Sequence, residues 1–207
     1  MNKLIISLII LSSNVFAQEK LAKDLLEKLS ITAQSYDNTS IDFDLIIENK
    51  SQKISEKQTG NIVIAEEKFR LTMEDQIVIN NGESQWIYLT DLNEVQIINH
   101  DDLNDLMSPS NIFNIYNKDY KFEYKGTVSE NGIRLHDIDL FPKTSREFIK
   151  INIKIDDIKN QLKKVKINDK NGGTISYILN EVTYNNEIKS FVFNISEYTD
   201  IEIIDLR

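Results

Sequence analysis

Strict alternation of apolar and polar residues is the feature that most constrains how this chain can fold. It is clearest in the stretch FIKINIKI at 148–155, where every second residue from Ile149 to Ile155 is an isoleucine. Successive side chains of a β-strand point to opposite faces, so such a stretch exposes one face to water and turns the other toward an apolar neighbour. The same period recurs from Ile41 to the C-terminus and predicts about eleven strands, the last two at 191–195 and 201–203.

Two segments depart from this period and predict helices. Residues from Glu19 to about Tyr36 place Ala22, Leu25, Leu26, Leu29 and Ala33 at helical spacing. The segment 101–117 also fits helices better than strands, and Ser108 before Pro109 is typical of a cap at a joint between two short helices or turns. Strands this numerous predict a sandwich or barrel, and an apolar sheet face must close on itself or be covered. Both helical segments are candidates for that cover.

Residues 80–99 predict a hairpin with unusual surfaces. A turn signal at Asn80-Asn81-Gly82 precedes one run through Trp86, Tyr88 and Thr90, and a second run follows through Val95 and Ile97. Trp86 and Tyr88 share one face of the first run, whereas Ile87 and Leu89 share the other. This strand is therefore apolar on both sides, and both sides need a neighbour.

The first seventeen residues predict export. Lys3 gives a basic start, Leu4 to Leu11 an apolar stretch, and Val15-Phe16-Ala17 a small-residue cleavage site. The apolar stretch is much shorter than the ~20 residues that cross a bilayer. We therefore expect a signal peptide at 1–17 and one mature domain at 18–207, located in the periplasm and not lipidated, because Gln18 rather than cysteine follows the site.

Composition and motifs argue against several kinds of chemistry. With 33 acidic and 24 basic residues the net charge is −9, which disfavours nucleic acid as a partner, and the absence of cysteine excludes disulfides and thiolate sites. Neither His100 nor His136 has a metal-ligand spacing, and no catalytic or cofactor fingerprint occurs. The acidic pair Asp137 and Asp139 lies at strand spacing and could serve a hydrolase only in a concave, partly buried setting. The sequence predicts no enzyme, no cofactor and no metal.

Five stretches, in order, resemble the LolA family of periplasmic outer-membrane lipoprotein carriers, in a form similar to members from the Bacteroidetes. One contains a strand that leads to Phe-Arg, one is similar to the family's Asp-Gly-x-x-x-Trp-x-Tyr hairpin with Asn81 in place of the aspartate, and the last resembles its Glu-Val-Ile-Asp-Leu-Arg ending. The stretches are GNIVIAEEKFRL at 60–71, NGESQWIYLTDLNEVQI at 81–97, SPSNIFNIY at 108–116, DLFPK at 139–143 and YTDIEIIDLR at 198–207.

The resemblance implies a fold and a role. The fold is mainly β: a single curved antiparallel sheet forming an incomplete barrel of about eleven strands, with an N-terminal helix and a short helical lid. The role is to bind the acyl chains of lipoproteins and shuttle the lipoproteins from the inner to the outer membrane. The carrier is expected to be a monomer. It would receive its cargo from an inner-membrane lipoprotein-releasing ABC transporter and deliver it to an outer-membrane acceptor that the sequence does not identify. The residues expected to line the cavity are Phe43, Leu45, Ile62, Ile64, Phe69, Leu71, Met73, Trp86, Tyr88, Val95 and Ile97. Those expected in the lid are Leu103, Leu106, Met107, Ile112, Phe113 and Tyr116.

The sequence also departs from the family pattern. Many members carry an Arg-Pro pair before Phe-Arg whose arginine holds the lid, but Ala65-Glu66-Glu67-Lys68 stands here. Arg70 is then the remaining candidate for a lid latch, although alternation places it opposite Phe69 and Leu71, where a surface arginine fits equally well. Two alternatives to the carrier stay open at this point: a sensor or interaction module on the same fold, which recognises lipid or a protein partner, and the hydrolase.

Overall fold

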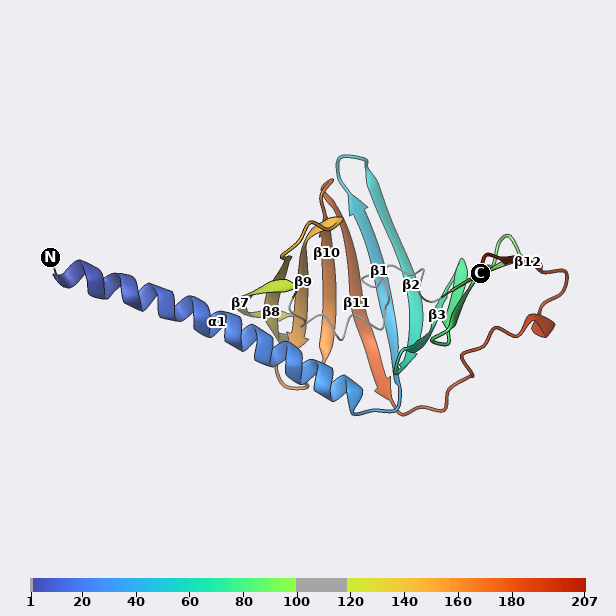
Figure 1. Cartoon of the computed structure of the whole chain (residues 1–207), viewed down its shortest axis with the longest axis horizontal. Coiled ribbons are helices and arrows are strands. Elements are labelled where there is room, and N and C mark those ends of the chain that lie inside the picture. Colours follow the sequence, from blue (N-terminus) through green and yellow to red (C-terminus); the bar gives the residue numbers. More distant parts are fainter. Residues whose placement is uncertain (1, 100–118) are drawn as a thin grey trace. The chain divides into compact units, whose positions relative to one another are not determined.

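The computed structural model of the chain describes residues 2–99 and 119–207, with side chains from Gln18 onward. Its described strands form one open, mixed sheet of twelve strands in the order β12-β6-β5-β4-β3-β2-β1-β11-β10-β9-β8-β7 (Figure 1). β12 and β7 end this order without pairing to each other, so the sheet is not closed. The predicted fold class is therefore confirmed: the chain is mainly β, with a single open sheet of the kind found in an incomplete barrel.

The elements have the following bounds. One α-helix, α1, spans Asn2–Gln34, and a short 3-10 helix, η3, spans Ile195–Glu197. The strands are β1 (Thr39–Asn49), β2 (Ile54–Ala65), β3 (Lys68–Met73), β4 (Gln76–Asn80), β5 (Ser84–Leu89), β6 (Glu94–Asn99), β7 (Tyr120–Glu130), β8 (Ile133–Pro142), β9 (Phe148–Asp156), β10 (Leu162–Asp169), β11 (Gly173–Tyr184) and β12 (Glu202–Asp205).

The predicted N-terminal helix is confirmed, and it is longer than expected. α1 starts at Asn2, within the predicted signal peptide, and ends two residues before Tyr36. Ala22, Leu26 and Leu29 are buried on one side, as the helical spacing predicts, whereas Leu21 is 41% exposed. Within the described part of the chain, no helix has the length and continuous apolar character that a membrane crossing requires.

The chain divides into two compact units, each described here by itself. The first comprises Met1–Ile31, Ile47–Ser55 and Tyr116–Ser176 and contains most of α1 and the antiparallel strands β7–β10. Its apolar core is tightly closed: Ile138 pairs with Ile153 and Leu140 with Ile151, and all four are at most 4% exposed.

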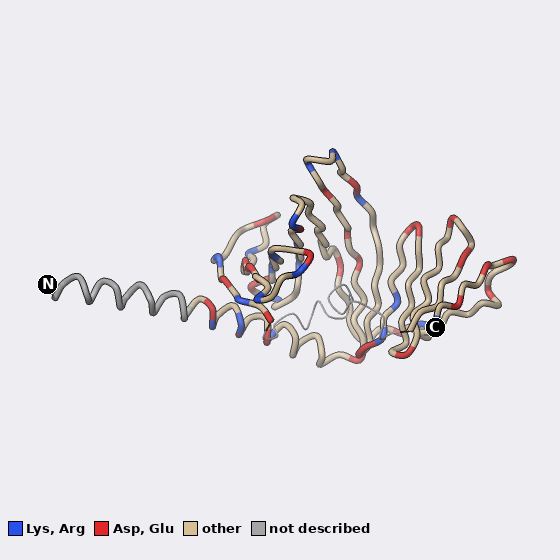
Figure 2. Tube along the Cα trace, turned by 45° about the horizontal axis from the view of Figure 1, so that its top comes forward, with Lys and Arg blue, Asp and Glu red and all other residues tan. Residues whose placement is uncertain are grey.

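The second unit comprises Thr32–Ile46, Glu56–Ile115 and Tyr177–Arg207. Its strands β2–β6 form an antiparallel meander, and the predicted hairpin is confirmed as β5 and β6. Asn81 shapes the turn before β5, because its side-chain Oδ1 accepts hydrogen bonds from the backbone N–H groups of Glu83 and Ser84. Figure 2 shows acidic residues at the turns of this meander, while the strands themselves are mostly uncharged.

Three details of the strand prediction were wrong. Residues 76–80 form β4, which the alternation did not indicate, because Ile77, Val78 and Ile79 are apolar on both faces. Residues 191–195 are not a strand: their aromatic side chains pack onto the sheet instead of entering it. β12 pairs with β6 in parallel, so the sheet is mixed and not purely antiparallel.

Candidate functional site

Strand register in the second unit sorts the apolar side chains of β2–β5 onto two faces. Directly paired residues share a face, so the row Ile62, Leu71, Val78 and Ile87 runs across four strands on one side. We call this side the Phe69 face. Its apolar side chains are Ile62, Ile64, Phe69, Leu71, Met73, Val78, Ile87 and Leu89, and the paired residues of β2–β5 on this face include no charged side chain.

β1 extends the Phe69 face at Gly60. A Cβ atom built on Gly60 would lie 2.6 Å from Cζ of Phe43, so the Phe43 ring lies directly over this glycine. Gly60 pairs with Met73, which places Phe43 on the Phe69 face, and alternation places Leu45 there too. The Phe43 ring also contacts Tyr177 of β11 edge-on, with ring centroids 5.7 Å apart.

The Phe69 face is only partly buried. Phe43, Ile62 and Phe69 are 3–5% exposed, but Leu45, Leu71, Ile87 and Leu89 keep an intermediate exposure. The core of the first unit, by contrast, has almost no accessible apolar surface. An apolar sheet face that stays half-open has surface to offer a ligand.

The opposite side of the meander, which we call the Trp86 face, is covered by the chain itself. Trp86 pairs with Ile79 and Ile97, and Tyr88 pairs with Ile77 and Val95. Residues 185–201, which we call the C-terminal segment, place the buried ring of Phe193 on this face, where it forms a core with Ile79, Tyr88 and Val95. Tyr88 lies 5.6 Å from Phe193 and 4.6 Å from Tyr198, measured between ring centroids.

Polar contacts hold the C-terminal segment in place. The Tyr88 hydroxyl donates a hydrogen bond to Oδ1 of Asn93 (3.0 Å), and Nδ2 of Asn93 donates to the backbone carbonyls of Thr199 and Asp200. Asn194 caps η3 by accepting a hydrogen bond from the N–H of Ser196. After the C-terminal segment the chain forms β12, which pairs with β6 and runs parallel to it.

Comparison with known proteins agrees with this architecture. The model of the family "Outer membrane lipoprotein carrier protein LolA" matches residues 34–196, most of the chain. This chain belongs to the LolA family.

Solved structures that are similar to this LolA-family chain share little sequence with it. An uncharacterized conserved protein from Thermus thermophilus has a TM-score of 0.58 at 11% identity, over 89% of this chain and 98% of that one. A LolA superfamily protein from Nitrosomonas europaea has a TM-score of 0.41 at 9% identity, over 81% and 94%. The Pseudomonas aeruginosa MucA/MucB complex has a TM-score of 0.47 at 16% identity, over 81% and 58%. No curated protein matches the sequence significantly.

The structure divides the residues that the LolA resemblance predicts as a lining. Seven lie together on the Phe69 face: Phe43, Leu45, Ile62, Ile64, Phe69, Leu71 and Met73. Four lie on the Trp86 face, and the first three of them pack against the C-terminal segment: Trp86, Tyr88, Val95 and Ile97. The predicted lid residues 101–117 lie outside the residues that the structure describes, as does His100.

Three residues of the Phe69 face were not in the predicted lining. The alternation of Ile87 and Leu89 with Trp86 and Tyr88 predicts that the two pairs lie on opposite sides of β5. The sequence does not show which of these sides is continuous with the apolar face of β2 and β3. Val78 lies in β4, a strand that the period-two pattern did not reveal.

Arg70 fastens the C-terminal segment. It lies on the side of β3 opposite Phe69, and its Nη2 donates hydrogen bonds to the backbone carbonyls of Ser190 (2.7 Å) and Val192 (3.5 Å). Its Nε is buried without a partner in the described chain, and burial lowers the pKa of the guanidinium. Arg70 therefore fastens the C-terminal segment, and its role as a latch for the lid stays a prediction, because residues 101–117 lie outside the residues that the structure describes.

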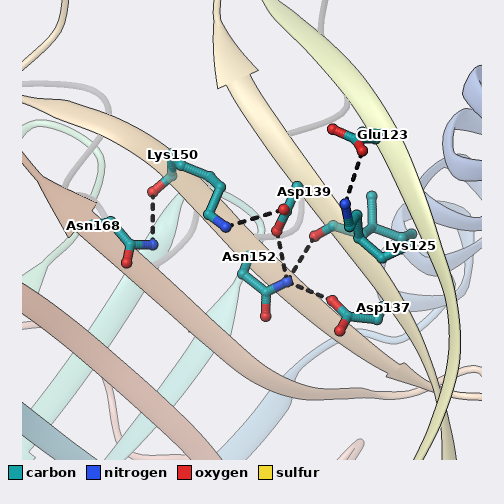
Figure 3. A network of polar contacts seen from close by, with 8 residues as sticks. Glu123, Lys125, Asp137, Asp139, Lys150, Asn152 and Asn168 are labelled. Atoms are coloured by element: carbon teal, nitrogen blue, oxygen red, sulfur yellow. Dashed lines mark hydrogen bonds and ion pairs between the residues drawn. The ribbon is translucent and has the colours of Figure 1, made fainter.

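The acidic pair considered for a hydrolase is held in a polar network of the first unit (Figure 3). Nδ2 of Asn152 donates to Oδ1 of Asp137 and to Oδ1 of Asp139 (2.8 Å), while Nζ of Lys150 contacts Oδ2 of Asp139 at 3.0 Å. Asp139 is only 6% exposed, and its two oxygens already have these partners. The arrangement is that of an ion-pair network that satisfies buried charges.

A second titratable cluster in the first unit surrounds His136. Nδ1 of His136 lies 2.9 Å from the Tyr124 hydroxyl and Nε2 lies 2.8 Å from Oδ1 of Asp157, which also pairs with Arg134. Partial burial and the nearby Asp157 raise the pKa of Tyr124. Among residues 18–99 and 119–207, no group of three or more acidic or histidine side chains could hold a metal ion.

Proposed function

We propose that this chain is a periplasmic carrier that binds the acyl chains of lipoproteins on the Phe69 face and shuttles them from the inner to the outer membrane. The observation that supports this most directly is the half-open Phe69 face in a chain of the LolA family. The Trp86 face is unsuited to this task, because the C-terminal segment already occupies it.

The chemistry of the Phe69 face fits alkyl chains. Its apolar side chains are aliphatic apart from two phenylalanines and one methionine, its polar side chains Gln76, Asn80 and Gln85 are uncharged, and acidic residues gather at the turns of the meander (Figure 2). Each methylene that leaves water for such a surface gains ~0.8 kcal/mol. The proposed lining joins Val78, Ile87 and Leu89 to the seven predicted residues, and the predicted lid at 101–117 remains the proposed cover.

The proposed route begins with export. Cleavage of the predicted signal peptide after Ala17 would release the mature domain into the periplasm. There an inner-membrane lipoprotein-releasing ABC transporter would load the carrier, and an outer-membrane acceptor would receive the cargo. The family membership and the leader sequence support this order of events.

A pair of neighbouring variants tests the acyl site. In Leu71→Glu a carboxylate replaces a half-buried leucine of the Phe69 face, and we expect binding of a fluorescent triacylated lipopeptide to weaken by about tenfold or more, because the charge loses water when the ligand covers it. Thr72→Glu is the matched control: Thr72 is the next residue of β3, lies on the other side and is exposed. It should leave the affinity unchanged.

Two results would contradict the proposal. One is equal loss of lipopeptide binding in both variants. The other is failure of the wild-type protein to bind any acylated ligand while it recovers one non-lipidated partner in stoichiometric amount, which is the behaviour of an interaction module.

A further inference from the structure

The turn between β9 and β10 contains the most exposed large apolar side chain among the residues that the structure describes. Ile158 is 90% exposed. Hydrogen bonds fix the turn around it: Oδ1 of Asp156 accepts from the backbone N–H groups of Ile158 and Lys159, both at 2.9 Å, and the N–H of Asn160 donates to the carbonyl of Asp156. One exposed apolar residue needs no explanation by itself, so its neighbours decide what it means.

A second exposed isoleucine lies on the adjoining turn. The N–H of Asp157 donates to the carbonyl of Arg134 (3.0 Å), which ties the β9–β10 turn to the start of β8. Ile133, the residue before Arg134, is 40% exposed. Two outward isoleucines therefore belong to one end of the first unit. We call residues 130–134 and 154–164 the Ile158 end.

The Ile158 end is basic, although the whole chain has a net charge of −9. Its basic residues are Arg134, Lys154, Lys159, Lys163 and Lys164, and its acidic residues are Glu130, Asp156 and Asp157. All three carboxylates already have partners. Glu130 contacts Lys154, Asp157 contacts Arg134, and Asp156 accepts from the N–H groups of the turn.

Three lysines of the Ile158 end remain without a counter-charge. Lys159, Lys163 and Lys164 form no ion pair with the residues that the structure describes. Lys159 is exposed, and the other two are half-buried. Lys164 also pairs directly with Lys154 across β9 and β10, and like charges in this position repel each other. An anion placed beside them would relieve this repulsion.

We propose that the Ile158 end docks the protein onto a membrane surface with anionic lipid headgroups. Ile158 and Ile133 enter the boundary between headgroups and acyl chains, and the free lysines pair with headgroup phosphates. Lysine suits this place, because its alkyl stem lies along apolar surface while its ammonium group stays in the polar layer. A polyanion in solution would satisfy the lysines but leave both isoleucines in water, so the combination favours a membrane.

The acidic net charge does not prevent this contact. Salt limits the reach of exposed charges to about 8–10 Å, so a headgroup layer senses the charges that lie closest to it. Docking of this kind would bring the carrier to the membranes between which we propose that it shuttles. The inference rests on the first unit alone and does not depend on the Phe69 face.

Binding of the exported protein to vesicles tests the proposal. We expect the wild type to sediment in low salt with vesicles of phosphatidylethanolamine and phosphatidylglycerol, but not with vesicles of phosphatidylcholine. Ile158→Ser should lower the partition coefficient about tenfold, because one isoleucine side chain no longer leaves water. Combined replacement of Lys159, Lys163 and Lys164 by glutamine should lower it by about tenfold or more and remove most of its dependence on salt.

Leu92→Ser is the matched control for the isoleucine. Leu92 is 66% exposed in the turn between β5 and β6, but its neighbours Asp91 and Glu94 are acidic. This variant should bind anionic vesicles as the wild type does.

Three results would overturn the docking role. They are failure of the wild type to bind anionic vesicles, equal loss in Ile158→Ser and Leu92→Ser, and wild-type binding to polyglutamate as tight as to the vesicles, which would assign the lysines to an acidic protein partner. None of them would affect the acyl site, because Ile158→Ser should bind the triacylated lipopeptide with wild-type affinity.

Discussion

Arg70 shows how one residue can serve a different segment from the one that its sequence position indicates. Arg70 lies in β3, on the side opposite the apolar Phe69 face. Its guanidinium donates to the carbonyls of Ser190 and Val192, about 120 residues further along the chain. An arginine suits this role, because Nη2 of its planar fork has two N–H groups and can donate to two carbonyls at once, and because the side chain stays charged despite partial burial.

Removing that fork should loosen the C-terminal segment. In Arg70→Met the aliphatic packing remains but both hydrogen bonds are lost, and we expect the free energy of unfolding to fall by about 1–2 kcal/mol. Compared with the wild type, the variant should show faster amide hydrogen exchange in residues 185–201 and unchanged exchange in β8 and β9. Arg134→Met is the control, since that side chain is 66% exposed and makes one surface ion pair, with an expected loss below about 1 kcal/mol. Equal losses of unfolding free energy in the two variants would contradict the role of Arg70 in fastening the C-terminal segment.

β5 is the element that separates the two apolar regions of the second unit. Its odd-numbered side chains Ile87 and Leu89 belong to the Phe69 face, while Trp86 and Tyr88 belong to the Trp86 face. Ile87 and Leu89 are partly exposed, whereas Tyr88 is buried against Phe193 and Trp86, itself partly buried, packs against the same cluster. A strand that is apolar on both sides is therefore a structural requirement at this place, and the Phe69 face is the side on which we propose that the ligand binds.

The single tryptophan makes this separation measurable. Phe193→Ala removes a buried ring from the Trp86 face, and we expect a loss of about 3 kcal/mol in unfolding free energy together with a red shift of Trp86 emission as water reaches the indole. An acyl ligand should leave the emission of the wild-type protein almost unchanged, because it binds on the opposite side of the sheet.

A second reporter provides the control for that measurement. In the double variant Trp86→Phe, Leu71→Trp the indole moves to the Phe69 face, and the same acyl ligand should shift its emission to the blue. A strong response of Trp86 combined with no response at position 71 would show that the ligand binds under the C-terminal segment.

Alternation predicted most strands of this fold but could not predict how their faces join. It identified β5, β6 and β9 from the local pattern alone, because each of these strands has apolar residues at every second position. It missed β4, which has apolar residues on both faces, and it assigned a strand to 191–195, where Phe191 and Phe193 alternate but pack over the sheet. Local pattern cannot distinguish pairing within a sheet from packing on it.

The same limit explains the divided lining. Sequence spacing shows that Trp86 and Tyr88 share a face, and that Phe69 and Leu71 share a face. Whether these two faces coincide depends on the register between β3, β4 and β5, which turn lengths and side-chain packing set. β4 was the missing strand, so the relation between the two faces could not be worked out.

At the scale of the whole molecule, a carrier must bind its cargo and also release it. Up to three acyl chains, with about 45 methylenes, would gain roughly 35 kcal/mol on complete burial. Non-covalent affinity does not exceed ~18–21 kcal/mol, so a carrier of such cargo can cover it only in part. The intermediate exposure of Leu45, Leu71, Ile87 and Leu89 agrees with partial cover.

Partial cover predicts a shallow dependence of affinity on chain length. Complete transfer of two methylenes from water would tighten binding by about fifteenfold. For monoacylglycerols with twelve to eighteen carbons, we expect each pair of added methylenes to tighten binding by about fivefold or less, as measured by calorimetry below the critical micelle concentration. The heat capacity change should be negative but should grow slowly along the series, because part of each longer chain stays in contact with water. A constant fifteenfold step up to eighteen carbons would mean that the chains enter a closed cavity, and the half-open Phe69 face would then not be the surface that holds them.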